Sequence, residues 1–385
     1  MQHRNTVLHR LLSHIRWHRF DAHVDRHASD KHVRTLTTKT QFIAMAYGQL
    51  SGADGLRETV TRFNSQESSH YHLGVKPVAK STMADANAKR PSAIFEDLFK
   101  DLVSVAQRRV RQSMEEATFL IDSTHLRLNE HSAKWARYSA GVCGAKVHVV
   151  YDPDADQPIY AAVSAANVND ITAAKQMPIE AGATYVFDLG YYDYAWWNKM
   201  HQAGCRIVTR LKTNTKLTIT REKHLPPGGP IIADRFGRLP ARQTHNRRNP
   251  MDCEMREVVV RIDTGKVIRV LTNDLTSSAQ TIADLYKRRW AIELHFRWIK
   301  QALKIKKFLG MSDNAVRTQV YIALIVFLLL HLAHQAEKVS LNLLDFVRLV
   351  RTHLMSRRDI RALDRPEDPR PQPDPGQYGL DWCQA

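Results

Sequence analysis

Apolar and polar positions follow different patterns in different parts of the chain. Up to about residue 112 the spacing is mostly helical, and FIAMAYGQLSGADGLRETV is typical of two helices around a glycine-containing turn. From about residue 115 the apolar runs become short and rich in β-branched residues, which predicts strands. Three strands joined by short turns, followed by alternating helices and strands, predict a mixed α/β sheet. The predicted strands are ATFLIDSTHLRL, AKVHVVYD, PIYAAVSA, TYVFDLG and CRIVTRL, and the predicted helices are ITAAKQMPIEAG, which Pro178 is expected to kink or end, and DYAWWNKMHQAG.

A stretch rich in Pro, Gly and Arg interrupts this alternation after residue 212. It leads into two strand patterns, MREVVVRID and KVIRVLTN, and so predicts an inserted β-rich segment. Residues 281–307 contain no Gly or Pro and are rich in good helix formers, which predicts one helix. The most hydrophobic run, Val320 to Leu330, is shorter than the about 20 residues that a spanning helix needs, and predicts a buried core helix.

These patterns divide the chain into five segments. They are a helical N-terminal domain (1–112), the first part of an α/β domain (113–211), a β-rich insertion (212–280), the second part of the α/β domain (281–345), and a C-terminal helix with a Pro-rich tail (346–385). The tail composition predicts disorder from Arg365 onward.

A possible DNA-reading element lies in the first segment. A turn containing Gly74 and Pro77 precedes Lys80, which opens a predicted helix with polar and basic residues at its start. This arrangement is compatible with a helix-turn-helix, and equally with an ordinary small helical bundle.

The charge of the chain indicates the class of partner. Lys and Arg number 56 against 39 Asp and Glu, which gives a net charge of +17. Such a surplus is typical of proteins with a polyanionic partner, most often DNA or RNA, although a basic surface can also bind nothing. The four cysteines are widely spaced, form no zinc pattern, and predict reduced thiols. The N-terminus lacks a signal-peptide core, so we expect an intracellular protein without a membrane partner.

Four side chains in the helix predicted over residues 281–307 fall on one stripe. Tyr286, Arg289, Glu293 and Lys300 are spaced so that, at about 100° per residue, they share a narrow face. A carboxylate among three groups that can contact phosphates or bases predicts an enzyme that cuts a nucleic acid backbone. The alternative is that Glu293 is an exposed i,i+4 partner of Arg297 or Arg289. An apolar stripe runs beside these positions and favours packing on a core: Leu285, Ile292, Phe296, Ile299 and Leu303.

Two further carboxylates end buried-strand patterns. Asp122 follows TFLI and Asp188 follows TYVF, at the position where an α/β sheet displays catalytic groups. Each alone is more often an ordinary turn or helix cap. With Glu293 they would form a set of three acids able to hold two Mg²⁺ ions, which together activate a nucleophile and stabilise a leaving oxygen. Asp122 would bridge the two ions, and Asp188 and Glu293 would each complete one side.

The remaining members of the stripe would then hold the nucleic acid. Arg289 and Lys300 would bind phosphate oxygens, and the hydroxyl of Tyr286 would donate to a phosphate, or its ring would stack on a base.

Three motifs together resemble the DDE transposases of the bacterial "insertion sequence four" group. They are FLIDSTHLRL around Asp122, YVFDLGYYDYAWW around Asp188, and the Y-R-E-K spacing in LYKRRWAIELHFRWIKQALKI, preceded by LTND. The region HASDKHVRTLTTKTQFIAMAYGQLSGADGLRE also resembles the helical segment that precedes the catalytic domain in a subset of these transposases.

The resemblance implies the following fold and activity. The fold would be an RNase H-like catalytic domain with a β-rich insertion before Glu293, preceded by a helical N-terminal domain. Asp122, Asp188 and Glu293 would form a triad for two Mg²⁺ ions, with Mn²⁺ as a substitute. The reaction would be cut-and-paste transposition through a hairpinned end.

The resemblance also implies partners. These are double-stranded DNA at terminal inverted repeats, target DNA, and a second copy of the chain in a synaptic dimer, in the bacterial cytoplasm at the nucleoid. Tyr286, Arg289 and Lys300 would hold the DNA end, including a flipped base. Some relatives stack that base on a tryptophan of the insertion, which this insertion lacks; Trp290 is a candidate for that role, and Trp298 is expected to pack in the core instead.

Two other functions stay open from the sequence. One is a DNA-binding regulator without catalysis, and the other is an RNase H-fold nuclease that acts on RNA or repair intermediates. The three acids argue against the first, and the absence of an aromatic RNA-reading motif argues against the second.

Overall fold

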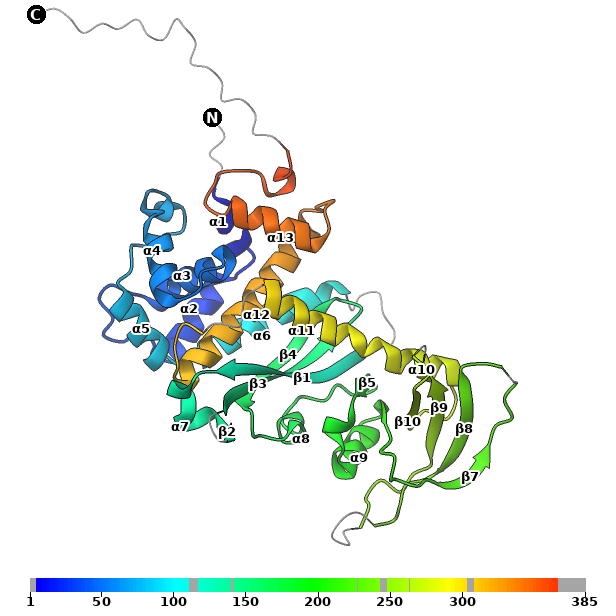
Figure 1. Cartoon of the computed structure of the whole chain (residues 1–385). Coiled ribbons are helices and arrows are strands. Elements are labelled where there is room, and N and C mark those ends of the chain that lie inside the picture. The colour runs from blue at the N-terminus through cyan, green and yellow to red at the C-terminus, as the bar shows by residue number, and fades with distance from the viewer. Residues whose placement is uncertain are drawn as a thin grey trace, which may run out of the picture.

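A single twisted sheet runs through the protein, in a computed structural model that describes residues 5–110, 117–139, 142–226, 228–242, 248–262, 264–302 and 308–365. Its ten strands are ordered β2-β3-β1-β5-β6-β10-β9-β8-β7, with β4 paired to β3 (Figure 1). The boundary expected near residue 112 and most of the Pro-rich tail lie outside the described residues. The strands are β1 (Thr118–Leu128), β2 (Arg137–Ser139), β3 (Val142–Asp152), β4 (Gln157–Ala165), β5 (Thr184–Phe187), β6 (Arg206–Arg210), β7 (Thr218–Glu222), β8 (Ile231–Arg238), β9 (Met255–Arg261) and β10 (Val267–Thr272).

The mixed α/β sheet predicted from the sequence is confirmed. Strand β1 pairs antiparallel with β3 and parallel with β5, and β5 pairs parallel with β6. Strand β3 also pairs antiparallel with β4. The helix predicted around Pro178 is shorter than expected, because α8 (Asp170–Ala174) ends ahead of that proline, whereas α9 (Tyr194–Gln202) matches its pattern.

The strands between residues 212 and 280 continue the same sheet. Strand β10 pairs antiparallel with the edge of β6, and β9, β8 and β7 follow outward. Strands β9 and β10 were predicted. Strands β7 and β8 were not, since the Pro/Gly-rich loop between them and the exposure of all five β7 residues hide any alternation.

The N-terminal helices pack around one long C-terminal helix, α12 (Asp313–Ala336). Helix α12 contacts α1, α3, α5 and α6, and also β4 and α11. One apolar core therefore includes Phe42 of α3, Phe95 of α6 and Val326 of α12 together with Val149 of β3. These helices are α1 (Val7–Leu12), α2 (Trp17–Arg26), α3 (Thr38–Ser51), α4 (Leu56–Asn64), α5 (Lys80–Lys89) and α6 (Ala93–Val110); α13 (Leu343–Thr352) follows α12.

Helix α12 is long and apolar enough, by composition, to cross a membrane. However, 94% of its most apolar stretch is buried inside the protein. The interpretation of Val320 to Leu330 as a buried core helix is therefore confirmed.

The segment before Lys80 contains a 3-10 helix as well as the expected turn, so α4 and α5 are not joined by a simple turn. A short 3-10 helix (Glu67–His72) follows α4, and Gly74 has a φ of +64°, which favours glycine. The carboxamide of Asn64 accepts a hydrogen bond from the backbone N–H of Val78 and donates one to its carbonyl, each at 2.9 Å. These bonds hold the turn against α4.

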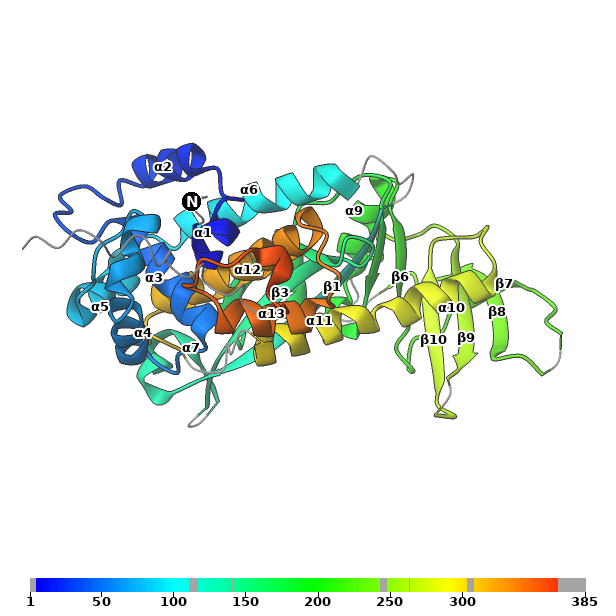
Figure 2. The same ribbon diagram turned by 90° about the horizontal axis from the view of Figure 1, so that it is seen from above.

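The prediction of one continuous helix over residues 281–307 is wrong, because the helix is interrupted at Arg289. The structure has α10 (Ala279–Arg288) and α11 (Trp290–Ala302), which run end to end along the sheet (Figure 2). At the junction the N–H of Arg289 bonds to the carbonyl of Tyr286, and the N–H of Ile292 bonds to that of Arg289, which are tighter i,i+3 bonds. Residues 303–307, with Leu303, lie outside the described part of the chain.

Candidate active site

Three carboxylates approach one another at the point where β1, β5 and α11 meet. Residues Ile121 and Phe187 are paired across the parallel strands β1 and β5, so the next residues, Asp122 and Asp188, lie side by side. Strand β5 ends at Phe187, and Asp188 accepts the N–H of Gly190 at 2.8 Å to start the following turn. Helix α11 lies against β1 and brings Glu293 to the same place.

Arg289 links two of these carboxylates. Its Nη1 donates to Oδ2 of Asp122 at 3.2 Å, and its Nη2 donates to Oε1 of Glu293 at 2.6 Å. The alternative in which Glu293 is an i,i+4 partner of Arg289 is therefore correct as a contact. It is not an exposed surface pair, however, since the Arg289 side chain is only 16% exposed and also reaches the sheet.

The surroundings of Asp122 raise the pKa of its carboxyl group. Burial raises the pKa of Asp122 to about 6, against hydrogen bonding by the Ser123 N–H and attraction by Arg289. The charges of Asp188 and Glu293 also raise this pKa, as the smallest of the contributions.

The donor set fits a hard divalent cation. Carboxylate oxygens are the ligands that such cations prefer, and a cation would relieve the crowding of charge at Asp122. Among the described residues no group of three His, Cys, Asp or Glu side chains is close enough to form a ready-made metal cage. The guanidinium of Arg289 instead supplies the positive charge between Asp122 and Glu293.

The other members of the stripe lie at increasing distance from this point. Tyr286 is half-buried, and its ring centroid is 6.0 Å from the guanidinium carbon of Arg289. Burial raises the pKa of Tyr286, against the charges of Arg289 and Arg210. Lys300 is near the end of α11 and lies close to His125 of β1, where its charge contributes to lowering the pKa of His125. The structure therefore brings Tyr286 and Arg289 to the carboxylates and sets Lys300 at one end of the group.

The two tryptophans of α11 differ in environment. Trp290 is 54% exposed and precedes Glu293 by about one turn, with the exposed Leu294 beside it. Trp298 packs edge-on against Phe327 of α12 with ring centroids 4.9 Å apart, which confirms the core role expected for it.

Sequence reasoning missed a second group of polar residues behind the carboxylates. Ser123, Lys146 and His148 surround Asp170 there: Ser123 donates a hydrogen bond to it, Lys146 forms an ion pair with it, and the ring of His148 lies 3.6 Å from it. Asp170 gave no separate signal, because an Asp at the start of a short helix is common. Arg210 was also missed; its position at the end of β6, next to β5, could have indicated it.

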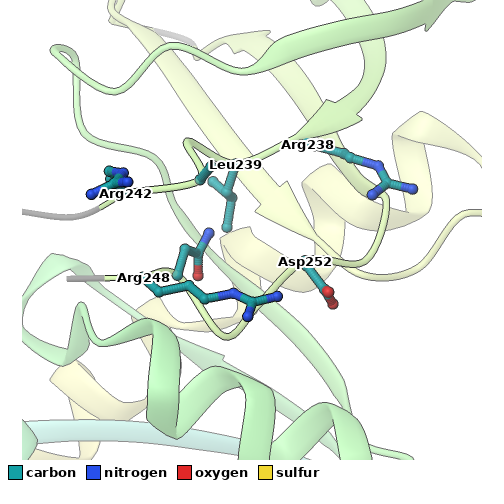
Figure 3. A pocket seen from close by; sticks show the side chains of 7 residues that line it. Arg238, Leu239, Arg242, Arg248 and Asp252 are labelled. Atoms are coloured by element: carbon teal, nitrogen blue, oxygen red, sulfur yellow. The ribbon is translucent and has the colours of Figure 1, made fainter. Parts of the chain in front are cut away.

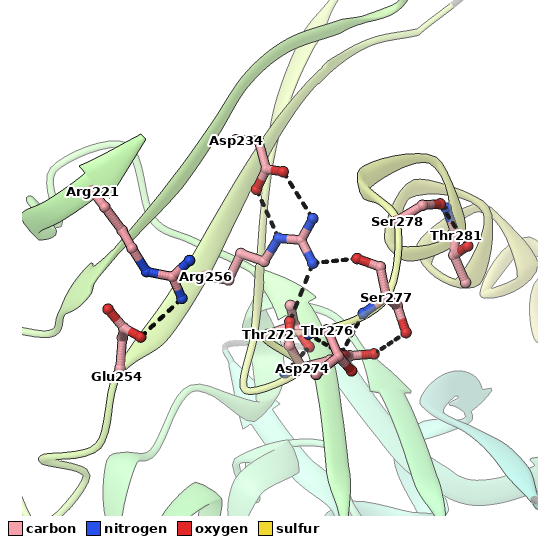
Figure 4. A network of polar contacts seen from close by, with 10 residues as sticks. All are labelled: Arg221, Asp234, Glu254, Arg256, Thr272, Asp274, Thr276, Ser277, Ser278 and Thr281. Atoms are coloured by element: carbon pink, nitrogen blue, oxygen red, sulfur yellow. Dashed lines mark hydrogen bonds and ion pairs between the residues drawn. The ribbon is translucent and has the colours of Figure 1, made fainter. Parts of the chain in front are cut away.

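A buried polar network fixes the start of α10. The guanidinium of Arg256 is 0% exposed and donates two hydrogen bonds to Asp234, at 2.7 and 2.8 Å, and one to the carbonyl of Ser277 at 2.5 Å (Figure 4). Asp274, in LTND, accepts the N–H groups of Thr276 and Ser277. Burial acts to raise the pKa of Asp274, but the hydrogen bonds from Ser277 and Thr276 outweigh it and hold the pKa far below its usual range. The network ties β8 and β9 to the helix that leads to Arg289.

A basic hollow lies on the loop after β8. It has a volume of about 430 Å³, and Arg238, Arg242 and Arg248 are on its wall with Asp252 (Figure 3). The neighbouring Leu239 is buried in the same apolar cluster as Phe187, so the loop is anchored to the core that packs on the sheet.

Comparison with known proteins identifies the family. Residues 114–329 match the transposase DDE domain, and residues 3–76 match a domain of unknown function (DUF4372). The chain is 40% identical over 314 residues to the putative transposase y4zB of Sinorhizobium fredii, covering 80% of this chain and 85% of that protein. It is 28% identical over 276 residues to the probable transposase for insertion sequence element IS5377 of Geobacillus stearothermophilus, covering 70% and 72%.

A solved structure, the piggyBac transposase synaptic complex with hairpin DNA, aligns with 90% of this chain and 78% of that chain at 12% identity. Its TM-score of 0.41 is too low to carry any argument about this chain. The domain match alone spans more than half of the residues, and the y4zB relative is matched over most of its length. The chain belongs to the family of transposases with a DDE domain, the transposases of insertion sequence elements.

Proposed function

We propose that this chain is a cut-and-paste DNA transposase of the "insertion sequence four" group, which cuts at the ends of its element and joins them to target DNA. The observation that carries the proposal is the approach of Asp122, Asp188 and Glu293 from β1, β5 and α11, with Arg289 bonded to both Asp122 and Glu293. The strand order β4-β3-β1-β5-β6 supports an RNase H-like catalytic domain. This domain would comprise residues 113–211 and 281–345, with 212–280 as its insertion and 1–112 as the N-terminal domain.

The same three residues are the proposed catalytic and metal-binding groups. Asp122, Asp188 and Glu293 would hold two Mg²⁺ ions or Mn²⁺, as expected of a family that uses divalent cations. The ions would supply Lewis-acid activation of the attacking and leaving oxygens. Glu293 and Asp122 provide hard oxygen ligands, and their side chains are 32% and 19% exposed, so both can be reached by a cation and a phosphate.

Arg289 has two proposed roles, one before DNA binds and one after. Without nucleic acid it neutralises Asp122 and Glu293, and with a DNA end bound it turns to a phosphate oxygen. Tyr286 would donate its hydroxyl to the same strand, and Lys300 would bind a phosphate farther along α11. A hairpin intermediate requires a sharply bent strand, and these three side chains, which follow one another along α10 and α11, would hold it.

We expect replacement of Arg289 with Ala to weaken binding of the element's end by about 10-fold. The slope of log affinity against log salt concentration should become shallower by about 1, as for the loss of one phosphate contact. Hairpin processing should slow as well. Fluorescence anisotropy at several salt concentrations measures the first two effects. Arg297→Ala, an exposed arginine on the same helix, is the matched control. Unchanged binding slope and unchanged end processing would show that Arg289 is only structural.

The proposed partner is double-stranded DNA at terminal inverted repeats, and target DNA. A net charge of +17 supports a polyanionic ligand, and the hollow with Arg238, Arg242 and Arg248 offers phosphate contacts away from the carboxylates. Two element ends must be held together for cut-and-paste movement, so the proposal includes a homodimer in the synaptic complex. It also sets the protein in the bacterial cytoplasm, at the nucleoid.

Trp290 is the proposed stacking partner for a flipped base. An exposed indole about one turn from Glu293 is otherwise an unfavourable apolar surface. We expect Trp290→Ala to lower hairpin formation by about 10-fold, since stacking on an aromatic ring contributes ~1–3 kcal/mol per base. Trp290→Phe should retain most of the rate. Leu294→Ala removes a side chain of similar exposure on the same helix and should have little effect. Equal losses in Trp290→Ala and Leu294→Ala would refute a stacking role.

The test of the proposed function is cleavage of a duplex that carries the element's own flanking end, in Mg²⁺, with products resolved on denaturing gels. We expect cuts at the end and a hairpin product, and none on a duplex with a scrambled end. Binding without cutting would favour a regulator. Cutting of an RNA–DNA hybrid in preference to the element's end would favour a nuclease of the RNase H type.

A further inference from the structure

A fourth carboxylate, Asp170, lies directly behind the proposed triad. It is in the first turn of α8, and its Oδ1 accepts a hydrogen bond from the hydroxyl of Ser123 at 2.8 Å. The same oxygen is 3.2 Å from the ammonium group of Lys146 and 3.6 Å from Nδ1 of His148. Asp170 is thus connected to β1 and β3 at once.

The contact with Ser123 leads to Asp122. The backbone N–H of Ser123 donates to Oδ1 of Asp122 at 2.7 Å, while its hydroxyl is held by Asp170. One residue therefore carries two hydrogen bonds that point in different directions, and each restricts the other. The contact of the hydroxyl with Asp170 restrains this point of β1, and with it the backbone N–H that orients the carboxylate of Asp122; loss of the contact would loosen both.

A second connection leads to Asp188 through Gly190. A Cβ at Gly190 would lie 3.1 Å from Oδ2 of Asp170 and 3.2 Å from Oδ1 of Asp188. The two carboxylates therefore approach from either side of a residue that has no side chain. The N–H of Gly190 donates to Asp188, so the turn that carries Asp188 is packed against Asp170.

The charge of Asp170 is balanced from the β3 side. Lys146 is 8% exposed and also donates to the carbonyl of Val168 at 2.9 Å. His148 is fully buried, and burial lowers its pKa to about 4, so the ring is neutral at pH 7. Of the two basic side chains that contact Asp170 in the described part of the chain, Lys146 is therefore the one that is charged at pH 7. The Lys146 side chain is 10% exposed and that of Asp170 22%, so separating them would leave a largely buried ammonium group without its partner.

The phenol of Tyr191 lies near Asp122, Asp170 and Asp188. It is 1% exposed, and burial raises its pKa well above the usual value, with the charges of Asp122, Asp170 and Asp188 adding to the effect. Asp170 therefore belongs to the same electrostatic neighbourhood as two members of the triad.

We propose that Asp170, anchored by Lys146, is a positioning residue that fixes Asp122 through Ser123 and fixes Asp188 through the Gly190 turn. This inference rests on the proposed function, in which Asp122 and Asp188 hold the divalent cation. Asp170 itself acts through its neighbours and does not touch DNA. A purely structural alternative is that Asp170 only stabilises the start of α8.

The test compares Asp170→Asn with Asp193→Asn. Asp193 is a matched control, because it also begins a helix, α9, and also pairs with a lysine, Lys175, at 2.6 Å. It makes no hydrogen bond or ion pair with the triad among the described residues. For each full-length variant we would measure the thermal midpoint, Mn²⁺ affinity without DNA by electron paramagnetic resonance, and the single-turnover cleavage rate as a function of DNA concentration.

We expect Asp170→Asn to weaken Mn²⁺ binding and to lower the maximal cleavage rate by about 10–100-fold each, as for loss of a residue that orients a metal ligand. The DNA concentration for half-maximal rate should change by less than about 2-fold, since Asp170 makes no phosphate contact. Asp193→Asn should leave Mn²⁺ affinity and rate near wild type, with a similar change in thermal midpoint.

A double-mutant cycle checks the route through Ser123. Ser123→Ala added to Asp170→Asn should cost less than the product of the two single losses, since both break the same connection. Wild-type Mn²⁺ affinity in Asp170→Asn, or equal losses in Asp170→Asn and Asp193→Asn, would overturn the inference. If the wild-type protein binds Mn²⁺ and Asp170→Asn does not, but neither protein cuts the element's end, the positioning role stands and the transposition chemistry is what fails.

Discussion

Replacement of Glu293 with Gln is expected to lower the single-turnover rate of cleavage at the element's end by about 10³-fold, a loss of the size seen when one member of a catalytic group is removed. Gln has nearly the same shape as Glu, and its carbonyl can still accept the hydrogen bond that Arg289 now gives to Oε1. The negative charge that a divalent cation needs is lost, while the phosphate-binding groups stay. Affinity for the end should therefore change by less than about 2-fold, since each phosphate contact is retained.

The measurement pairs a rate with an affinity. Single-turnover cleavage on gels gives the rate, and binding of the same duplex without metal gives the affinity. Asp284→Asn is the matched control: Asp284 is an exposed acid on α10, hydrogen-bonded to Gln280. Wild-type cutting by Glu293→Gln would remove Glu293 from the proposed triad, and a parallel loss in Asp284→Asn would point to net charge as the cause.

Replacement of Arg256 with Met is expected to lower the free energy of unfolding by about 3–5 kcal/mol, the usual cost of breaking a buried ion pair by removing one partner. Arg256 is 0% exposed and Asp234 is 2% exposed, so Met would leave a buried carboxylate without its two hydrogen bonds. The carbonyl of Ser277, just before α10, would lose its donor as well. Urea unfolding followed by circular dichroism measures the change.

Two further variants separate burial from charge. The pair of Arg221 and Glu254 is drawn in the same view but is exposed, at 50% and 30%, so Arg221→Met should cost at most about 1 kcal/mol (Figure 4). Replacing Asp234 with Leu in the Arg256→Met background should recover part of the loss, because no unpaired buried charge remains. A loss below about 1 kcal/mol in Arg256→Met would show that the network contributes little.

The strands β1, β3, β4, β5 and β6 were predicted from the sequence, whereas only β9 and β10 of the four strands beyond β6 were predicted. Strands β1 and β5 contain the runs FLI and TYVF, and β3 and β6 are rich in β-branched residues, because these parts of the strands are buried. Strand β7 has no buried residue, so nothing in its sequence separates it from a loop. The break at Arg289 had no Gly or Pro to mark it, and the contact of this arginine with Asp122 across to β1 is not visible in the local sequence.

The proposed site divides in the same way. Asp122 and Asp188 end apolar runs, and Glu293 belongs to a regular helical spacing, so local patterns were sufficient to select them. The residues behind them could not be found this way. Ser123 faces His148, and His125 faces Lys146, only because of the register between β1 and β3. Asp170 joins them from another helix, and no local pattern encodes that meeting.

The position of α12 in the chain has a consequence for synthesis of the protein. About 200 residues separate the end of α6 at Val110 from the start of α12 at Asp313, and the ribosome adds ~5–20 residues per second. The apolar faces of α3 and α6 that α12 covers must therefore wait about 10–40 s, at that rate, for the helix that completes their core. During this interval the nascent chain presents a surface that chaperones and proteases recognise. The late arrival of one helix thus makes the yield of active transposase depend on the folding machinery of the host cell.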